Sequence, residues 1–285
     1  MSPRHVIVGN GSDDILNLLF RCFSSSDQLA GFTEPSYSLY PILAQIQGSQ
    51  CISVEFDRTF MLDPAKVTAS KANIFFLTSP NAPTGIHFTP ETITTLLENF
   101  PGLLVVDEAY AAFAATNAIA LLSEHPNLCI VRTFSKSHGL AGLRVGYGLA
   151  NSEVIQALDT IRDSYNVNQL AQVGALAALQ DPSYYQATIQ TIIDTREKYL
   201  TEFRDRGWFT YDSQANFIFT EPIDSSGQRG PEVAQALFEY LKTRKILVRY
   251  FKGHPLTNTF LRITVGNEHS MQILLEEIDS WLQNA

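Results

Sequence analysis

The stretch "NIFFLTSPNAPTGIHFTPETITTLLENFPGLLVVDEAY" (residues 73–110) contains two short apolar runs on either side of a helical pattern. The apolar runs, at 73–79 and 103–110, have the composition of buried strands. The helical pattern starts with the pair Thr-Pro, a typical N-terminal signal, which predicts a helix over 89–100. A strand, a helix and a second strand in this order indicate two parallel strands joined by a crossover helix.

The same alternation continues on both sides of this unit. "VGNGSDDILNLLFRCF" (8–23) predicts an amphipathic helix with Ser12 and Asp13 as its cap residues. Strands that alternate with helices predict an α/β fold, with a mainly parallel sheet covered by helices on both faces. Ligands of such sheets bind at the carboxyl ends of the strands, so the polar residues after each apolar run are the candidate functional residues. Further strands are predicted at 29–33, 51–56 and 128–135.

The pattern changes after about residue 152, where two long helical stretches begin. They are followed by a smaller mixture of strands and helices, with a surface loop at 224–230. We therefore expect a large domain at 1–180 and a smaller C-terminal α+β domain at 181–285. The elements predicted for the smaller domain are strands at 216–222, 246–251 and 260–266 and helices at 230–244 and 268–284.

Composition limits the partners and the compartment. The net charge of -9 argues against nucleic-acid binding and against attraction to an anionic membrane surface. No apolar stretch reaches the roughly 18 residues that a transmembrane helix needs. Cys22, Cys51 and Cys129 lie far apart in apolar runs and are predicted to be buried thiols, which indicates a reducing, cytoplasmic compartment. The six histidines lack metal-ligand spacing, so no metal site is expected.

Two glycine-containing motifs each have a plain and a functional interpretation. The glycines of "GNGSDD" (9–14) leave backbone N–H groups free to bind an anion, but the motif lacks the third glycine of a dinucleotide site and the lysine of a P-loop. A simple helix cap is the alternative. "SPNAPTG" (79–85) is either an ordinary loop or a place where Asn81 donates a hydrogen bond to a ligand.

Two further motifs place charged residues at the ends of buried strands. In "LLVVDEAY" (103–110), Asp107 would be partly desolvated and needs a cationic or N–H partner, unless it only caps the next helix. In "TFSKSHGLAGLRVGYGLA" (133–150), Lys136 follows a strand with small residues after it. This setting suits a buried reactive amine, although most single lysines lie in solvated loops.

Taken together, S-P-N-x-P-T-G, V-V-D-E-A-Y, T-x-S-K and an arginine eight residues after the lysine resemble the fold-type I aminotransferases that depend on pyridoxal phosphate (PLP). Within that superfamily, "GNGSDD", "DEAYAAF", "YNVN" (165–168) and "LRITVG" (261–266) look like histidinol-phosphate aminotransferase. The resemblance covers nearly the whole chain. It implies a large PLP-binding domain, a smaller C-terminal domain, and a cytoplasmic homodimer that acts in histidine biosynthesis.

The resemblance also implies which residues would contact the cofactor ring and how. Lys136 would bind the aldehyde of PLP and later move the proton at the substrate's Cα. Asp107 would keep the pyridine nitrogen protonated. Asn81 and Tyr110 would hydrogen-bond the ring hydroxyl, and Tyr37 would stack on the ring. Lys136, Asp107 and Tyr110 are the expected catalytic residues.

The cofactor's phosphate and the substrates have their own expected ligands. The phosphate would bind backbone N–H groups at Ser12 and Asp13, the Ser135 hydroxyl and the Arg144 guanidinium. The implied substrates are histidinol phosphate and the pair glutamate and 2-oxoglutarate, held by two arginines at predicted strand ends, Arg262 and Arg249.

The family has an N-terminal segment ahead of its glycine-rich loop, with an arm that covers the site and a tyrosine that reaches the neighbouring subunit. In this sequence the loop begins at residue 9. We therefore expect the segment to be missing and the site to be more open. Three alternatives stay open: an aromatic-amino-acid transaminase, a threonine-phosphate decarboxylase-like enzyme, or a PLP-binding protein with impaired catalysis.

Overall fold

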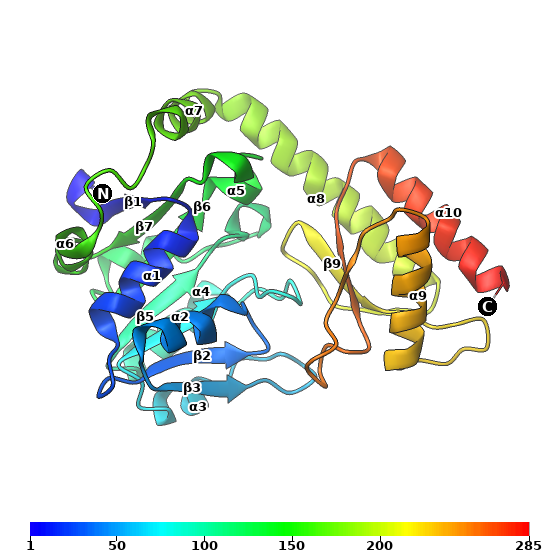
Figure 1. Ribbon diagram of the computed structural model, residues 1–285, viewed down its shortest axis with the longest axis horizontal. Coiled ribbons are helices and arrows are strands. Elements are labelled where there is room, and N and C mark those ends of the chain that lie inside the picture. The colour runs from blue at the N-terminus through cyan, green and yellow to red at the C-terminus, as the bar shows by residue number, and fades with distance from the viewer. Residues whose placement is uncertain (285) are drawn as a thin grey trace.

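The computed structural model describes residues 1–284 and contains two β-sheets (Figure 1). The larger sheet has seven strands in the order β1-β7-β6-β5-β4-β2-β3. Its strands are β1 (Val6–Gly9), β2 (Ala30–Glu34), β3 (Cys51–Glu55), β4 (Ile74–Thr78), β5 (Leu103–Asp107), β6 (Leu128–Thr133) and β7 (Gly146–Ala150). The smaller sheet has four antiparallel strands in the order β10-β11-β9-β8, namely β8 (Phe209–Thr210), β9 (Phe217–Glu221), β10 (Arg249–Tyr250) and β11 (Leu261–Thr264).

The larger sheet is mainly parallel, which confirms the predicted α/β fold. Strands β2 to β6 pair in parallel, whereas β7 pairs antiparallel with β6, and β1 pairs antiparallel with β7. Thr78 at the end of β4 lies opposite Asp107 at the end of β5, and Asp107 lies opposite Val131 of β6. The polar residues at these carboxyl ends therefore meet at one edge of the sheet.

Helices cover both faces of this sheet, and alternate residues of the central strands enter two separate cores. Phe75, Leu77, Leu104 and Val106 pack with one set of helices, while their sequence neighbours face the other set. The first face is covered by α3 (Pro64–Ala69) and α4 (Pro90–Asn99), and the second by α1 (Ser12–Phe23), α2 (Leu39–Gln47) and α6 (Ser152–Ile161). Burial on both faces explains why these strands are continuous apolar runs.

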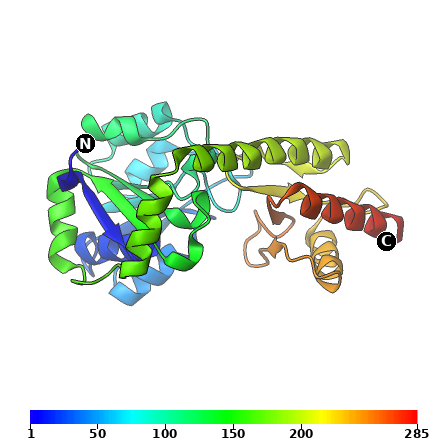
Figure 2. The same cartoon turned by 90° about the horizontal axis from the view of Figure 1, so that it is seen from above.

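The smaller sheet packs against helices of the C-terminal half. The long helix α8 (Pro182–Asp205) runs from the larger sheet to the smaller one, as Figures 1 and 2 show. Helices α9 (Pro231–Thr243) and α10 (Glu268–Asn284) complete this core. The remaining helices are α5 (Phe134–Ser137), α7 (Gln169–Leu179) and the 3-10 turns η1 (Pro3–His5), η2 (Ala111–Phe113), η3 (Ile119–Ser123) and η4 (Ala141–Leu143). No helix within residues 1–284 is long and apolar enough to cross a membrane.

Several local expectations need correction. Helix α1 has Gly11 as its N-cap with no side-chain cap, so Ser12 and Asp13 begin the helix instead of capping it. Cys51 is exposed because β3 is an edge strand, and Cys22 is only half-buried, whereas Cys129 is buried as predicted. The strand expected at 246–251 is reduced to the two residues of β10. The domain boundary at residue 180 stays a prediction.

Candidate active site

A cavity of about 240 Å³ lies at the carboxyl ends of β4, β5 and β6 and extends to the smaller sheet. It is lined by most of the residues that the sequence predicted for the site. Those residues are Ser12, Asp13, Tyr37, Asp107, Tyr110, Ser135, Lys136, Arg144 and Arg262. Asn81 and Arg249 do not line this cavity. The sheet thus brings together side chains that are more than 200 residues apart in the sequence.

Asp107 lies at the buried end of β5, where only 3% of its surface is exposed. The Tyr40 hydroxyl donates to its Oδ2 at 3.0 Å, and the backbone N–H of Ala109 donates to its Oδ1 at 3.1 Å. Burial raises the pKa of Asp107 to about 6, and the hydrogen bond from Tyr40 opposes this rise. The carboxyl group is therefore partly protonated near pH 6, and a cationic N–H ligand beside it would hold it in its charged form.

Lys136 is placed by the short helix α5, which follows β6 directly. The Thr133 hydroxyl caps this helix by accepting from the Ser135 N–H at 3.1 Å. The Lys136 ammonium lies 5.8 Å from the centre of the Tyr110 ring, and within residues 1–284 it makes no hydrogen bond or ion pair. Burial lowers its pKa, and the Arg262 charge lowers it further. A lysine in this state has more of the neutral, nucleophilic amine.

One end of the cavity is formed by the N-terminus of α1, where the first backbone N–H groups have no helical partner. Gly11 has a φ of 86°, and a Cβ there would lie 2.5 Å from Arg144 Nη2. A Cβ at Gly146 would collide with the backbone of Gly11 and Ser12. Only glycines allow the N-terminus of α1 to pack this closely against β7 and Arg144. The free backbone N–H groups and the guanidinium together form a site that suits an anion.

The two carboxylates at this anion end, Asp13 and Asp14, are both hydrogen-bonded within the protein. Arg144 donates to the Ser135 hydroxyl and to Asp13 Oδ2, both at 3.3 Å. The Tyr37 hydroxyl donates to Asp13 Oδ1 at 3.1 Å. Asp14 turns away and accepts from the Asn10 N–H at 2.9 Å. The acidic first turn therefore does not present two free carboxylates to an anion.

Arg262 reaches the cavity from β11 of the smaller sheet. Its Nε is buried and has no hydrogen-bond partner within residues 1–284. The guanidinium lies 5.0 Å from the Phe217 ring centre, and burial lowers its pKa, with the nearby Arg249 charge lowering it further. A buried guanidinium donor without a partner is an unused site for a carboxylate or phosphate.

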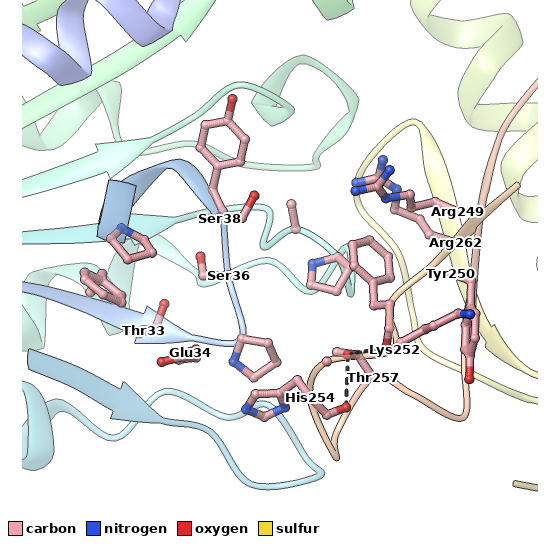
Figure 3. A pocket seen from close by; sticks show the side chains of 18 residues that line it. Thr33, Glu34, Ser36, Ser38, Arg249, Tyr250, Lys252, His254, Thr257 and Arg262 are labelled. Atoms are coloured by element: carbon pink, nitrogen blue, oxygen red, sulfur yellow. Dashed lines mark hydrogen bonds between the residues drawn. The ribbon is translucent and has the colours of Figure 1, made fainter. Parts of the chain in front are cut away.

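A second cavity of about 600 Å³ adjoins the first and shares Tyr37, Ala82 and Arg262 with it. The segment 32–38 forms one wall and the segment 249–254 forms the other. Arg249 lies opposite Arg262 in the β10–β11 register, and Figure 3 shows the two guanidinium groups side by side on one wall. This cavity therefore presents two arginines to a ligand.

Asn81 lies behind the cavity and not on its surface. It is buried, and its side-chain oxygen accepts from the Thr84 hydroxyl at 2.9 Å. Its amide nitrogen donates to the Pro35 carbonyl at 3.4 Å, so the side chain joins two loops at the cavity edge. The role expected for it on a ligand stays a prediction.

The sequence reasoning missed three residues that complete the site. Thr78 and Thr133 line the first cavity, and the Tyr40 hydroxyl donates a hydrogen bond to Asp107. The threonines are the last residues of β4 and β6 and lie within two residues of the ends predicted for these strands, so their position was a usable signal. Tyr40 carried no such signal, since it lies in the apolar pattern of α2. Within residues 1–284, no group of three or more His, Cys, Asp and Glu residues could hold a metal ion.

Comparisons with known proteins agree with this geometry. Residues 1–278 match the family described as "Aminotransferase class I and II". The chain is 43% identical over 278 residues to histidinol-phosphate aminotransferase of Syntrophotalea carbinolica, covering 95% of this chain and 75% of that protein. It is 39% identical over 273 residues to the protein of that name from Microcystis aeruginosa, covering 96% of this chain and 76% of that protein.

A solved structure has the same fold over the whole chain. The crystal structure of histidinol-phosphate aminotransferase from Sinorhizobium meliloti in complex with pyridoxal-5'-phosphate superposes with a TM-score of 0.90 at 25% identity. The match covers 100% of this chain and 78% of that chain. With the family match and the two curated relatives, this shows that the chain belongs to the class I and II aminotransferases.

Proposed function

We propose that this chain is a PLP-dependent aminotransferase that transfers an amino group between histidinol phosphate and 2-oxoglutarate. The observation that carries the proposal is Lys136, a partly buried amine that makes no ion pair within residues 1–284 and lines one cavity together with Asp107 and the anion end. A cofactor with an aldehyde, a basic ring nitrogen and a phosphate would find a matching group for each: Lys136 for the aldehyde, Asp107 for the ring nitrogen and the anion end for the phosphate. The names of the curated relatives support the choice of substrate.

The residues present fit PLP in three respects. The N-terminus of α1, the Ser135 hydroxyl and Arg144 together offer donors for a phosphate. The glycines at 11 and 146 leave no room for a Cβ, so the N-terminus of α1, Arg144 and β7 pack closely and their donors lie together. Burial raises the pKa of Asp107 to about 6, and a protonated ring nitrogen beside it would lower that pKa and hold the carboxylate in its charged form.

When bound, PLP supplies an electron-withdrawing ring that stabilises the negative charge left at the substrate's Cα after its proton is removed. The protein's residues divide the remaining work. Asp107 would hold the proton on the ring nitrogen, and Tyr37 would cover the ring. Tyr110 would face the ring hydroxyl, and Asn81, buried behind the cavity, would hold together the two loops beside it. Lys136 would carry the Cα proton, for which its lowered pKa is suited.

The two arginines account for substrates with an anionic group at one end. Arg262 would bind the α-carboxylate of glutamate, because its buried Nε needs an acceptor. The phosphate of histidinol phosphate would lie between Arg262 and Arg249, which share one wall of the larger cavity (Figure 3). A bidentate arginine contact with either anion would fix the position of the reacting carbon.

We also propose that the enzyme is a homodimer in the cytoplasm. Helix α7 exposes Leu170, Val173, Leu176 and Leu179 by 57 to 77% of their surfaces. Its buried side packs on Phe134 and Val145, which flank the lysine segment. A second copy on this helix would cover apolar surface next to the active site. The three free thiols agree with a reducing compartment.

The test is to purify the chain with PLP and record its visible absorbance alone, with glutamate and with histidinol phosphate. The proposal expects an absorbance band of bound cofactor that is lost with either amino donor and restored by 2-oxoglutarate. In Lys136→Ala the band should be absent or unresponsive, whereas the matched control Lys245→Ala should behave like the parent protein. Conversion by phenylalanine but not by histidinol phosphate would overturn the substrate assignment. Release of carbon dioxide from phosphothreonine would instead indicate a decarboxylase.

A further inference from the structure

Arg196 is a buried arginine in the middle of α8 that does not touch either cavity. Only 3% of its surface is exposed. Its Nη1 donates to two backbone carbonyls, those of Phe113 and Ala215, both at 3.0 Å. Within residues 1–284 its acidic contact is Glu197, whose side chain is 56% exposed. A buried guanidinium is costly to desolvate. Here Glu197 pairs with its charge, and the Nη1 bonds go to backbone from two different parts of the chain.

The two carbonyls belong to segments that hold active-site residues. Phe113 ends η2, which begins directly after Tyr110. Ala215 precedes β9, whose Phe217 packs edge-to-face against the Tyr110 ring with centres 5.0 Å apart. The Arg262 guanidinium lies over the Phe217 ring, 5.0 Å from its centre. Phe217 therefore supports a cofactor-side tyrosine and a substrate-side arginine at once.

Gln214 makes two further hydrogen bonds in this region, one to the neighbouring loop at Gly85 and one to the segment after η2. The Gln214 N–H donates to the Gly85 carbonyl at 2.8 Å, and the Gln214 side chain accepts from the Ala115 N–H at 2.9 Å. Gly85 has a φ of 79°, and a Cβ there would collide with Ser213. We call residues 113–115 and 213–217 the seam, because they join the two sheets beside the cavity. Arg196 donates to both sides of the seam.

We propose that Arg196 is a positioning residue, which holds the seam so that Phe217 keeps Arg262 aligned with the cavity on the larger sheet. The inference rests on the role proposed above for Arg262. It predicts that loss of Arg196 weakens binding of the anionic substrate group while the cofactor, which the larger sheet holds, stays bound. A small misplacement of a positioning group can lower rates by about a hundredfold, so the effect is measurable.

The experiment compares Arg196→Met with Arg206→Met in the PLP-loaded full chain. Arg206 caps the same helix and also makes several bonds, to Glu202 and Asp279, but these lie away from the seam. For each variant, calorimetry gives the Kd of succinate, a dicarboxylate that lacks an amino group and cannot react. The KM and kcat for glutamate and the visible absorbance of bound PLP are measured alongside.

For Arg196→Met we expect the Kd of succinate and the KM of glutamate to rise roughly tenfold, with bound PLP unchanged. Arg206→Met should change neither constant by more than about twofold. If Arg196→Met does not fold, Arg196→Lys replaces it, with a rise of at least about threefold because one ammonium cannot reproduce the planar fork. Unchanged constants in a folded Arg196 variant, equal rises in Arg206→Met, or loss of PLP would each overturn the inference. A parent protein that glutamate does not convert would instead overturn the proposed function.

Discussion

The Tyr40 hydroxyl donates a hydrogen bond to Asp107 Oδ2 at 3.0 Å, inside the core between α2 and the larger sheet. The same hydroxyl lies 2.6 Å from Thr78 Oγ1, and neither Tyr40 nor Thr78 is exposed by more than 2%. Burial of the Asp107 carboxylate carries a desolvation penalty that its two donors, the Tyr40 hydroxyl and the Ala109 N–H, only partly offset. The strength of the hydrogen bond between Tyr40 and Asp107 therefore affects the pKa of Asp107.

Replacing Asp107 by Asn should change how the stability of the cofactor-free protein depends on pH. The pKa of Asp107 is about 6 in the folded protein, against 3.8 for an unperturbed aspartate. The stability that the protonated group contributes is complete below pH 3.8 and is lost as pH rises through 6, in total about 3 kcal/mol. Urea unfolding of Asp107→Asn between pH 4.5 and 8 should lack this fall. An identical slope in both proteins would show that Asp107 is not the titrating group.

Tyr40→Phe should raise the pKa of Asp107, because the lost hydrogen bond favoured the charged form. A hydrogen bond to a charged group is worth ~1.5 to 3 kcal/mol, so the midpoint of the pH-dependent stability change should move up by about one pH unit or more. Urea unfolding of Tyr40→Phe over the same pH range measures this midpoint. Tyr37→Phe is the control, since its hydroxyl donates to Asp13 and not to Asp107. Equal shifts in both variants would contradict the assignment.

Arg262→Gln should raise the pKa of Lys136. Burial is the main cause of its lowered pKa, and the Arg262 charge is the next. Removal of that charge makes the amine more basic, so less of it is neutral at pH 8. The pH dependence of Lys136 modification by trinitrobenzenesulfonate, read by peptide mapping, should shift to higher pH. Arg249→Gln should shift it less, and the reverse order would count against the geometry of the site.

Gly146→Ala should weaken PLP binding by at least about tenfold, equivalent to ~1.4 kcal/mol. A Cβ at residue 146 meets the backbone of Gly11 and Ser12, which would push the N-terminus of α1 away from the phosphate. Gly142→Ala is a matched control in the neighbouring segment, because a Cβ there has no neighbour within 4 Å. Fluorescence titration of the cofactor-free proteins with PLP gives both affinities. Normal affinity in Gly146→Ala would remove the helix end from the phosphate site.

Much of the fold could be predicted because its strands are buried on both faces. Such strands are continuous apolar runs, as in β4 and β5, and Thr89 and Pro90 mark the start of α4 clearly. Strand β1 was missed because it is a short edge strand with Val8 exposed. The short strand β10 ends early because its pairing with β11 covers two residues only. Edge pairing depends on tertiary contacts that a local pattern does not record.

The site was predictable where chemistry and strand ends coincide, and less so where support comes from elsewhere. Lys136, Asp107 and Arg144 stand out because charged residues follow apolar runs or glycines. Tyr40 and Arg196 have no such sequence signal, since each lies within a helical pattern. Their hydrogen-bond partners, Asp107 and Phe113, lie 67 and 83 residues away in the chain. Residues that act through long-range hydrogen bonds are therefore visible only in the folded chain.

Val173→Glu should convert the proposed homodimer into a monomer. Val173 lies on α7 with 61% of its surface exposed, and Leu170 and Leu176 lie one turn away on either side with exposures of 77% and 57%. A charge buried at the centre of an apolar interface costs several kcal/mol, enough to shift a micromolar equilibrium fully. Light scattering after size exclusion measures the mass. Leu247→Glu is the control, because this residue is 83% exposed but lies beyond α9 near the smaller sheet. A parent chain that is already monomeric, or a Val173→Glu dimer, would contradict the proposed interface.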